Sequence, residues 1–217
     1  MTDCRGEATI TSCSVDIKQP VNNTLKHLQP YFELGAKFHG YLSPGLTLGI
    51  IMVDLAQELL GPRYLVDAIV ETKACLPDAI QLMTPCSYGN GWMQVKNWGK
   101  VALTLYDKYQ LDGIRISVNL EKSRKYPLIE QWLMRIGNVN KEEVTGEIMR
   151  VGRRILSWQR VRVDPDRKIK KAPLRICSVC GEAHPAIEGD LCTRCSRKEN
   201  YYELADNPAS NLKKLTK

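Results

Sequence analysis

Four cysteines near the C-terminus form two pairs, Cys177/Cys180 and Cys192/Cys195, with two residues inside each pair and eleven between the pairs. A Cys-x-x-Cys turn directs both of its sulfurs at one ion, and two such turns complete the tetrahedron of thiolates that Zn²⁺ accepts. The four residues are therefore predicted to hold a structural Zn²⁺ ion. Because a closed four-thiolate site leaves no open coordination position, we assign it no catalysis.

Other occupants of this cysteine set are a rubredoxin-like iron ion or an iron–sulfur cluster, and a further alternative is four unligated cysteines. His184 lies between the pairs and could replace a cysteine as ligand. Since the set of four is complete without it, we expect His184 at the surface. A module this small cannot bury a core of its own, so metal binding would supply much of its folding free energy.

The remaining candidates for chemistry are His39, Cys75 and Cys86. A histidine beside a cysteine can bind a transition metal or activate a thiolate nucleophile. Asp78, three residues after Cys75, would orient His39 or a ligand, or serve as a helix cap. The plain alternatives are inert buried cysteines and a histidine satisfied inside the core.

Length and composition limit the kind of protein that holds these residues in place. The chain has 217 residues, enough for one ordinary domain and a small module, and 43% hydrophobic and 25% charged residues are typical of a soluble globular protein. No apolar run reaches the roughly 18 residues that cross a bilayer, and residues 1–10 lack a signal-peptide core. We therefore expect a cytoplasmic protein without a membrane segment, in which cysteine pairs indicate metal or redox chemistry more than disulfides.

The net charge of +7 is concentrated in residues 150–175, where ten Lys or Arg residues face only two Asp residues. Such a segment could bind nucleic acid or an acidic protein. The single aromatic residue of this segment, Trp158, makes no interleaved pattern that suggests base stacking, so a solvated helix face followed by a linker is favoured. On that interpretation Arg153 and Arg154 point to water.

The hydrophobic pattern predicts an α+β core rather than a doubly wound sheet, because strands and helices do not alternate regularly. Helices are expected over residues 22–38 (broken or kinked at Pro30), 45–60, 77–83 and 128–136. Strands are expected over residues 66–70, 100–106 and 114–118, the last two as a hairpin with its turn at Asp112-Gly113. A longer helix is expected from a cap at Asn140, with an apolar stripe of Val144, Ile148, Val151, Ile155 and Trp158.

These elements divide the chain into five parts. We predict an N-terminal arm (residues 1–20), a core domain (21–162), a basic linker (163–174), a zinc-binding module of the zinc-ribbon or treble-clef kind (175–200) and a tail (201–217). Cys4 and Cys13 fall in the arm, where no pattern assigns them a role.

Four segments of the core resemble the FmdE family, which takes its name from a component of formylmethanofuran dehydrogenase. They are Phe-His-Gly-Tyr-Leu-Ser-Pro-Gly at 38–45, Glu-Thr-Lys-Ala-Cys-Leu-Pro-Asp-Ala-Ile-Gln at 71–81, Thr-Pro-Cys-Ser-Tyr-Gly-Asn-Gly at 84–91, and residues 99–106. With the zinc module, the similarity spans about residues 25–134 and 175–196. The resemblance implies a dimerising α+β core with a cleft that carries His and Cys side chains. It also implies association with the molybdenum or tungsten enzyme that fixes CO₂ onto methanofuran.

One departure from the family pattern His-Gly-His-x-Cys-Pro-Gly bears on function, because Tyr41 and Ser43 stand here in place of His and Cys. Three hypotheses stay open. They are a metal site of His39 with one or both of Cys75 and Cys86, a thiol site in which His39 activates Cys75 or Cys86, and a site without chemistry that binds a ligand or partner or merely packs. We favour the third, and hence an accessory or regulatory protein over an enzyme.

Overall fold

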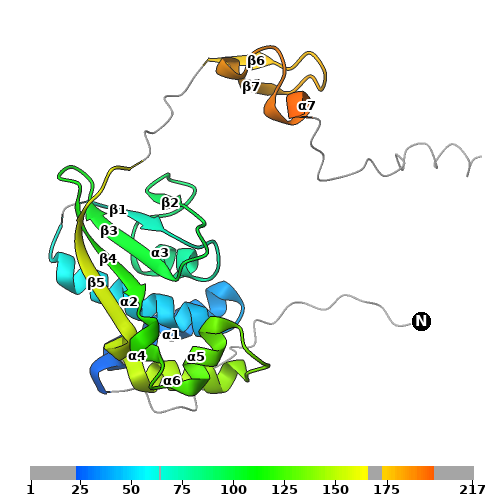
Figure 1. Ribbon diagram of the computed structural model, residues 1–217. Coiled ribbons are helices and arrows are strands. Elements are labelled where there is room, and N and C mark those ends of the chain that lie inside the picture. Colours follow the sequence, from blue (N-terminus) through cyan, green and yellow to red (C-terminus); the bar gives the residue numbers. More distant parts are fainter. Residues whose placement is uncertain (1–22, 64, 166–172, 198–217) are drawn as a thin grey trace, which may run out of the picture. The chain divides into compact units, whose positions relative to one another are not determined.

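Helix α2 (Pro44–Leu60) is the centre of the N-terminal unit. The computed structural model describes residues 23–63, 65–165 and 173–197, and the chain divides into two units, Met1–Asp164 and Pro165–Lys217 (Figure 1). Every residue of α2 from Pro44 to Val53 is buried, and the helix contacts strands and helices on several sides. Such an all-round apolar sequence forms a helix that its neighbours must surround.

Local signals set both ends of α2. The Ser43 hydroxyl accepts a hydrogen bond from the Leu46 N–H at 3.1 Å, and Pro44 occupies the first helical position, where a missing N–H costs nothing. Gly61, with φ +71°, ends the helix, and its N–H donates to the Gln57 carbonyl at 3.0 Å. The predicted helix over residues 45–60 is confirmed.

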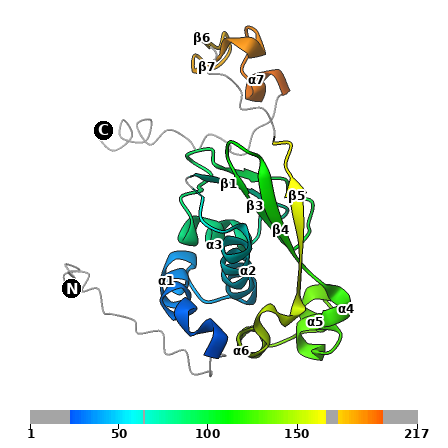
Figure 2. The same cartoon turned by 90° about the vertical axis from the view of Figure 1, so that its left-hand side faces the viewer.

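A five-stranded sheet packs against this helix in the order β2-β1-β3-β4-β5. Strands β1 (Val66–Val70) and β2 (Met93–Val95) are parallel, and β3 (Ala102–Asp107), β4 (Asp112–Val118) and β5 (Leu156–Arg162) extend the sheet in antiparallel pairs. Alternate residues of β3 and β4 (Leu103, Leu105, Ile114, Ile116) join α2 in the core. Figure 2 shows α1, α2 and α3 on the same side of the sheet.

The remaining core helices are short. They are η1 (Asn23–Leu28), α1 (Gln29–His39), α3 (Leu76–Met83), α4 (Leu120–Ser123), α5 (Pro127–Met134), α6 (Lys141–Val151) and η2 (Gly152–Ile155). Pro30 lies in the first turn of α1 and so begins that helix instead of breaking one. The α+β prediction is confirmed, and no described helix has the length and apolar character to span a bilayer.

The helix predicted from Asn140 to Trp158 is wrong in its second half. Helix α6 stops at Val151 because Gly152 adopts φ +62°, and the chain passes through η2 into β5. Trp158 therefore lies on a strand, opposite Ile116 of β4. The apolar residues of this stretch do recur every three to four positions, as they would in a helix. The pairing of seven residues of β5 with β4 outweighs that local preference.

Two smaller expectations also change. The turn of the β3–β4 hairpin falls at residues 108–111, where the Asp107 carboxylate accepts the Tyr109 and Gln110 N–H groups, and Asp112 and Gly113 belong to β4. Arg153 does not point to water, because its guanidinium bonds the carboxylates of Asp54 at 2.5 Å and Glu58 at 2.7 Å.

The C-terminal unit contains a hairpin of β6 (Leu174–Ile176) and β7 (Ala183–Pro185), then η3 (Ala186–Glu188) and α7 (Thr193–Arg197). Of its described residues, only Cys177 and His184 are buried. Apolar burial therefore contributes little to the stability of this unit.

The contact between α2 and α3 has no room for an added methyl group at Gly49. A Cβ there would lie 2.8 Å from the Ala79 Cβ. We expect Gly49→Ala to lower the free energy of unfolding by about 1–2 kcal/mol, because overpacking outweighs the gain in helix propensity. Urea unfolding should show that adding Ala79→Gly recovers part of this loss, whereas Gly89→Ala, with nothing near its Cβ position, should be close to neutral. A Gly49→Ala protein as stable as the wild type would contradict this packing.

Candidate functional site

The first pair of zinc-candidate cysteines lies in the turn between β6 and β7. The Cys177 N–H donates to the Glu182 carbonyl at 2.9 Å, and the Gly181 N–H donates to the Cys177 carbonyl at 3.0 Å. Gly181 has φ +75°, a conformation that glycine adopts at little cost and that closes the turn. Both sulfurs of the pair are thereby held on one side of a single tight turn.

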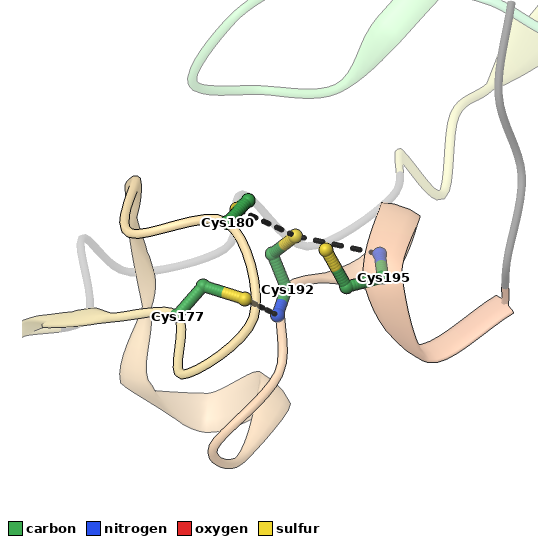
Figure 3. A group of neighbouring side chains, drawn as sticks. All are labelled: Cys177, Cys180, Cys192 and Cys195. Carbon is green, nitrogen blue, oxygen red and sulfur yellow. Dashed lines mark hydrogen bonds between the residues drawn. The ribbon is translucent and has the colours of Figure 1, made fainter.

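The second pair is placed by α7. Cys192 precedes the helix and Cys195 lies within it, and the Sγ atoms of all four cysteines fall within 4.8 Å of one another (Figure 3). Cys180 Sγ and Cys192 Sγ are 3.9 Å apart. Four bonds of ~2.3 Å in a tetrahedron give sulfur–sulfur distances of ~3.8 Å, so the observed spacing fits a Zn²⁺ ion.

Electrostatics favour a cation among these sulfurs. Backbone N–H groups of Cys180, Cys192 and Val179 lower the pKa of Cys177 to about 6. The hydrogen bond with the Cys192 side chain, together with burial, raises the pKa of Cys195 to about 12. Neighbouring thiols oppose one another's ionisation, and a bound dication removes this opposition and stabilises all four thiolates.

His184 is buried, with 5% of its surface exposed, so the expectation of a surface residue is wrong. Its Nδ1 lies 3.8 Å from a Glu188 carboxylate oxygen, and neither ring nitrogen has a hydrogen-bond partner within the described part of the chain. The register of β6 and β7 places His184 opposite Arg175, and its ring occupies the interior of a unit that has few other side chains to fill it.

Cys75 forms the tip of a strained turn at the start of α3. Its φ of +56° and ψ of −45°, with a hydrogen bond of 2.6 Å from the Leu76 N–H to the Ala74 carbonyl, define a γ-turn of the rare, strained form with positive φ. Residues other than glycine rarely hold such a conformation, and those that do are concentrated at functional sites.

The first turn of α2 holds the Cys75 side chain in place. The Ser43 hydroxyl lies 3.6 Å from Cys75 Sγ, within hydrogen-bond reach of sulfur, while it also caps α2. A Cβ added at Gly45 would lie 2.9 Å from Cys75 Sγ and 3.0 Å from Cys75 Cβ. Glycine at position 45 is therefore required for the thiol to occupy this position.

A buried ion pair anchors the chain just before this turn. The Arg115 guanidinium on β4 makes a two-pronged contact with the Glu71 carboxylate, at 2.6 and 2.9 Å, and Glu71 is buried at the end of β1. The bond to Glu71 raises the pKa of Arg115, so the guanidinium stays charged throughout the physiological range. Because Glu71 is only four residues from Cys75, the pair restrains the strand end from which the turn departs.

His39 is bound by Asp78 and not by a cysteine. It is the last residue of α1, and its Nδ1 lies 2.5 Å from Asp78 Oδ2 on α3. The His39 ring also lies against Tyr41, with ring centroids 5.7 Å apart. The contact between Asp78 and His39 that the sequence suggested is thus present, and it links α1 to α3.

Cys86 has a different environment. It is fully buried, and its thiol donates to the Val66 carbonyl at 3.2 Å. Burial raises the pKa of this thiol, which therefore stays protonated and unreactive at neutral pH. Among the described residues, the four C-terminal cysteines are the one group of three or more His, Cys, Asp or Glu side chains placed to share an ion, so His39, Cys75 and Cys86 do not form a three-ligand centre.

A cavity of about 640 Å³ opens at Cys75. Its lining comes from the Cys75 turn, from the residues before β3 and from the α5–α6 connection, including Trp132, Arg135 and Lys141. A second hollow of about 450 Å³, at the C-terminal end of α2, contains no Cys or His. Of these two cavities, the one at Cys75 is therefore the one lined by a thiol and an indole.

Sequence reasoning missed several residues of this site. Ser43 enters the sequence prediction only as the residue that stands where the family pattern has a cysteine. Ser-Pro before an apolar run is nevertheless a recognisable helix start. Trp132, Arg135 and Lys141 have no local signal, because only the packing of α5 and α6 brings them beside Cys75.

Two family models match the chain. The one described as "FmdE, Molybdenum formylmethanofuran dehydrogenase operon" covers residues 38–163, more than half of the chain. The chain belongs to the FmdE family. The "FmdE treble clef zinc finger" model covers residues 168–203 and so includes the four clustered cysteines.

Two individual proteins are similar to this chain. A crystal structure of a tungsten formylmethanofuran dehydrogenase FmdE-like protein from Syntrophus aciditrophicus is 38% identical, with a TM-score of 0.76, and the match covers 84% of this chain and 100% of that one. A "Probable S-adenosyl-L-methionine-binding protein" from Archaeoglobus fulgidus is 29% identical over 196 residues. That match covers 77% of this FmdE-family chain but only 52% of the relative, so the chain spans about half of the relative's length.

The strain at Cys75 predicts an unusual order of stabilities. We expect Cys75→Gly to be more stable than Cys75→Ala by about 1–2 kcal/mol, because only glycine adopts this φ and ψ without cost. At the neighbouring exposed Lys73, which has no positive φ, glycine should be no more stable than alanine. Urea unfolding of the four variants measures both differences, and an alanine at 75 as stable as glycine would show that the turn is unstrained.

Proposed function

We propose that this FmdE-family protein is a zinc-containing accessory protein whose core binds a small molecule in the cavity at Cys75. The observation that carries the proposal is the cavity itself, because a strained cysteine and a half-buried tryptophan line a space large enough for a ligand of nucleoside size. The zinc ion has a structural role in the other unit.

The proposed zinc ligands are Cys177, Cys180, Cys192 and Cys195. The sulfur spacing, the N–H groups directed at Cys177 and the treble-clef family match all support this ion. Since the described part of the unit buries almost no apolar surface, metal binding is proposed to supply most of its folding free energy.

The arrangement of the core favours binding over catalysis. Activation of a thiol needs a base within hydrogen-bond reach, yet the partner of Cys75 is the Ser43 hydroxyl, and the Nδ1 of His39 is engaged by Asp78. Cys86 is buried on the Val66 carbonyl. These contacts support a site that positions a ligand without attacking it.

Nucleic-acid binding is a weaker alternative. Arg153 is held by Asp54 and Glu58, and residues 166–172 of the basic segment lie outside the described residues.

The name of the A. fulgidus relative suggests S-adenosylmethionine as one compound to test in the core cavity.

Zinc content tests the metal assignment. We expect one zinc ion per wild-type chain by elemental analysis, and a loss of most of it in Cys192→Ser, because three thiolates bind far more weakly than four. Cys75→Ser and Cys86→Ser serve as matched controls and should each retain the full zinc content. A second equivalent of metal that disappears with Cys75→Ser would instead establish a metal centre in the core.

The partner prediction follows from the family. We propose that the protein forms a homodimer, as the sequence resemblance implies. We also propose that it associates with a molybdenum or tungsten formylmethanofuran dehydrogenase, an enzyme named in the description of the family model. Size-exclusion chromatography with light scattering should give twice the chain mass of 24.6 kDa, and mixing with the purified enzyme should shift both proteins to one earlier peak. A monomer that elutes independently of the enzyme would contradict both parts.

A further inference from the structure

We infer that the cavity at Cys75 selects anionic ligands, with a carboxylate or phosphate group attached to a planar body. This inference rests on the proposed ligand-binding role of the core and specifies the ligand class. It is carried by the charges, the aromatic wall and the backbone conformations of the residues that line the cavity.

The charges that line the cavity are all positive. Arg135 and Lys141 line it, and its lining contains no Asp or Glu. Neither side chain forms an ion pair with any of the residues that the structure describes, whereas Arg115 and Arg153 are both neutralised by carboxylates. Two uncompensated cations around a hollow raise the local concentration of anions and oppose the entry of a metal cation.

The wall of the cavity suits a planar group. Trp132 is half-buried on α5, and its Cζ2 approaches within 4.0 Å of the position that a Gly45 Cβ would occupy, which places the indole beside the Cys75 thiol. The Gln131 and Asn138 amides line the same space and offer both donors and acceptors. An indole face binds planar ligands by stacking, and amides at its edge fix their orientation.

Backbone conformation gives an independent indication that this cavity is a built site. Cys75 and Arg135 both have φ +56°, and the lining glycines Gly99 and Gly137 have φ +71° and +69°. Arg135 ends α5 at a position where glycine or asparagine is the usual residue. Both non-glycine side chains are therefore held against a local conformational cost, as expected where the side chain serves a ligand.

The experiment uses Cys75 as a reporter in the full zinc-loaded chain with Cys4→Ser and Cys13→Ser. Its thiolate attacks an aromatic disulfide, a mixed disulfide forms on Cys75, and the released aryl thiolate is measured by absorbance. The anionic reagent is 5,5′-dithiobis(2-nitrobenzoate), and the neutral one is 2,2′-dithiodipyridine. We divide the labelling rate with the anionic reagent by the labelling rate with the neutral one. This ratio should fall about tenfold in Arg135→Asn/Lys141→Gln, because each exposed charge contributes a factor of a few.

The variants are chosen to remove charge without new strain. Asparagine tolerates the left-handed conformation at 135, and glutamine is a good helix former at 141. Arg160→Gln, an exposed charge on β5, is the matched control and should leave the rate ratio unchanged. An equal fall in Arg160→Gln would show a general charge effect and overturn the inference.

Ligand protection then separates the two anion classes. Adenosine 5′-monophosphate is compared with adenosine, and indole-3-acetate with indole-3-acetamide, as agents that slow the labelling of Cys75 by the neutral reagent. We expect protection by one or both anions, little by their neutral counterparts, and its loss in Arg135→Asn/Lys141→Gln. Equal protection by charged and neutral partners would overturn the anion selectivity while keeping a ligand-binding core. A Cys75 that reacts with neither reagent would show that the cavity admits no aromatic group to the thiol and would overturn the inference. Protection by none of the four compounds would overturn the proposed core function as well.

Discussion

The packing of the Cys75 turn on the first turn of α2 is the contact on which the core site depends. No Cβ fits at Gly45 beside the Cys75 sulfur, and the Ser43 hydroxyl serves both that sulfur and the N-terminus of α2. The buried helix α2 and the strained Cys75 turn are thereby joined. Two further contacts restrain the same turn. The Glu71–Arg115 pair holds the chain before the turn, at the end of β1, and the His39–Asp78 bond holds it after the turn, on α3.

The C-terminal unit depends on a different kind of interaction. It has a short hairpin, a short helix and almost no described apolar interior, so packing cannot account for its structure. What its sequence does specify is the convergence of four sulfurs, two on a tight turn and two around the start of a helix. On the proposed function, a cation at that point would neutralise thiolates that otherwise oppose one another's ionisation, and folding and metal binding would become one process.

Patterns that are local in sequence predicted much of this structure. The bounds of α2 follow from Gly61-Pro62 and an apolar run, the β3–β4 hairpin from alternation, and the sulfur cluster from cysteine spacing. Predictions failed where long-range contacts decide the outcome. Trp158 fits a helical stripe but pairs with β4, Arg153 is drawn to carboxylates on α2, and His184 fills the interior of a unit that has little else to bury. The cavity residues Trp132, Arg135 and Lys141 share no sequence motif, because only the packing of α5 and α6 brings them beside Cys75.

The central claim is that metal and ligand occupy separate units, with zinc confined to the four C-terminal thiolates and the cavity at Cys75 left to a small molecule. A crystal structure of the full chain with anomalous diffraction measured at the zinc edge tests this most directly. The account predicts one anomalous peak per chain, centred among Cys177, Cys180, Cys192 and Cys195. A second peak at Cys75 or between His39 and Asp78 would contradict it.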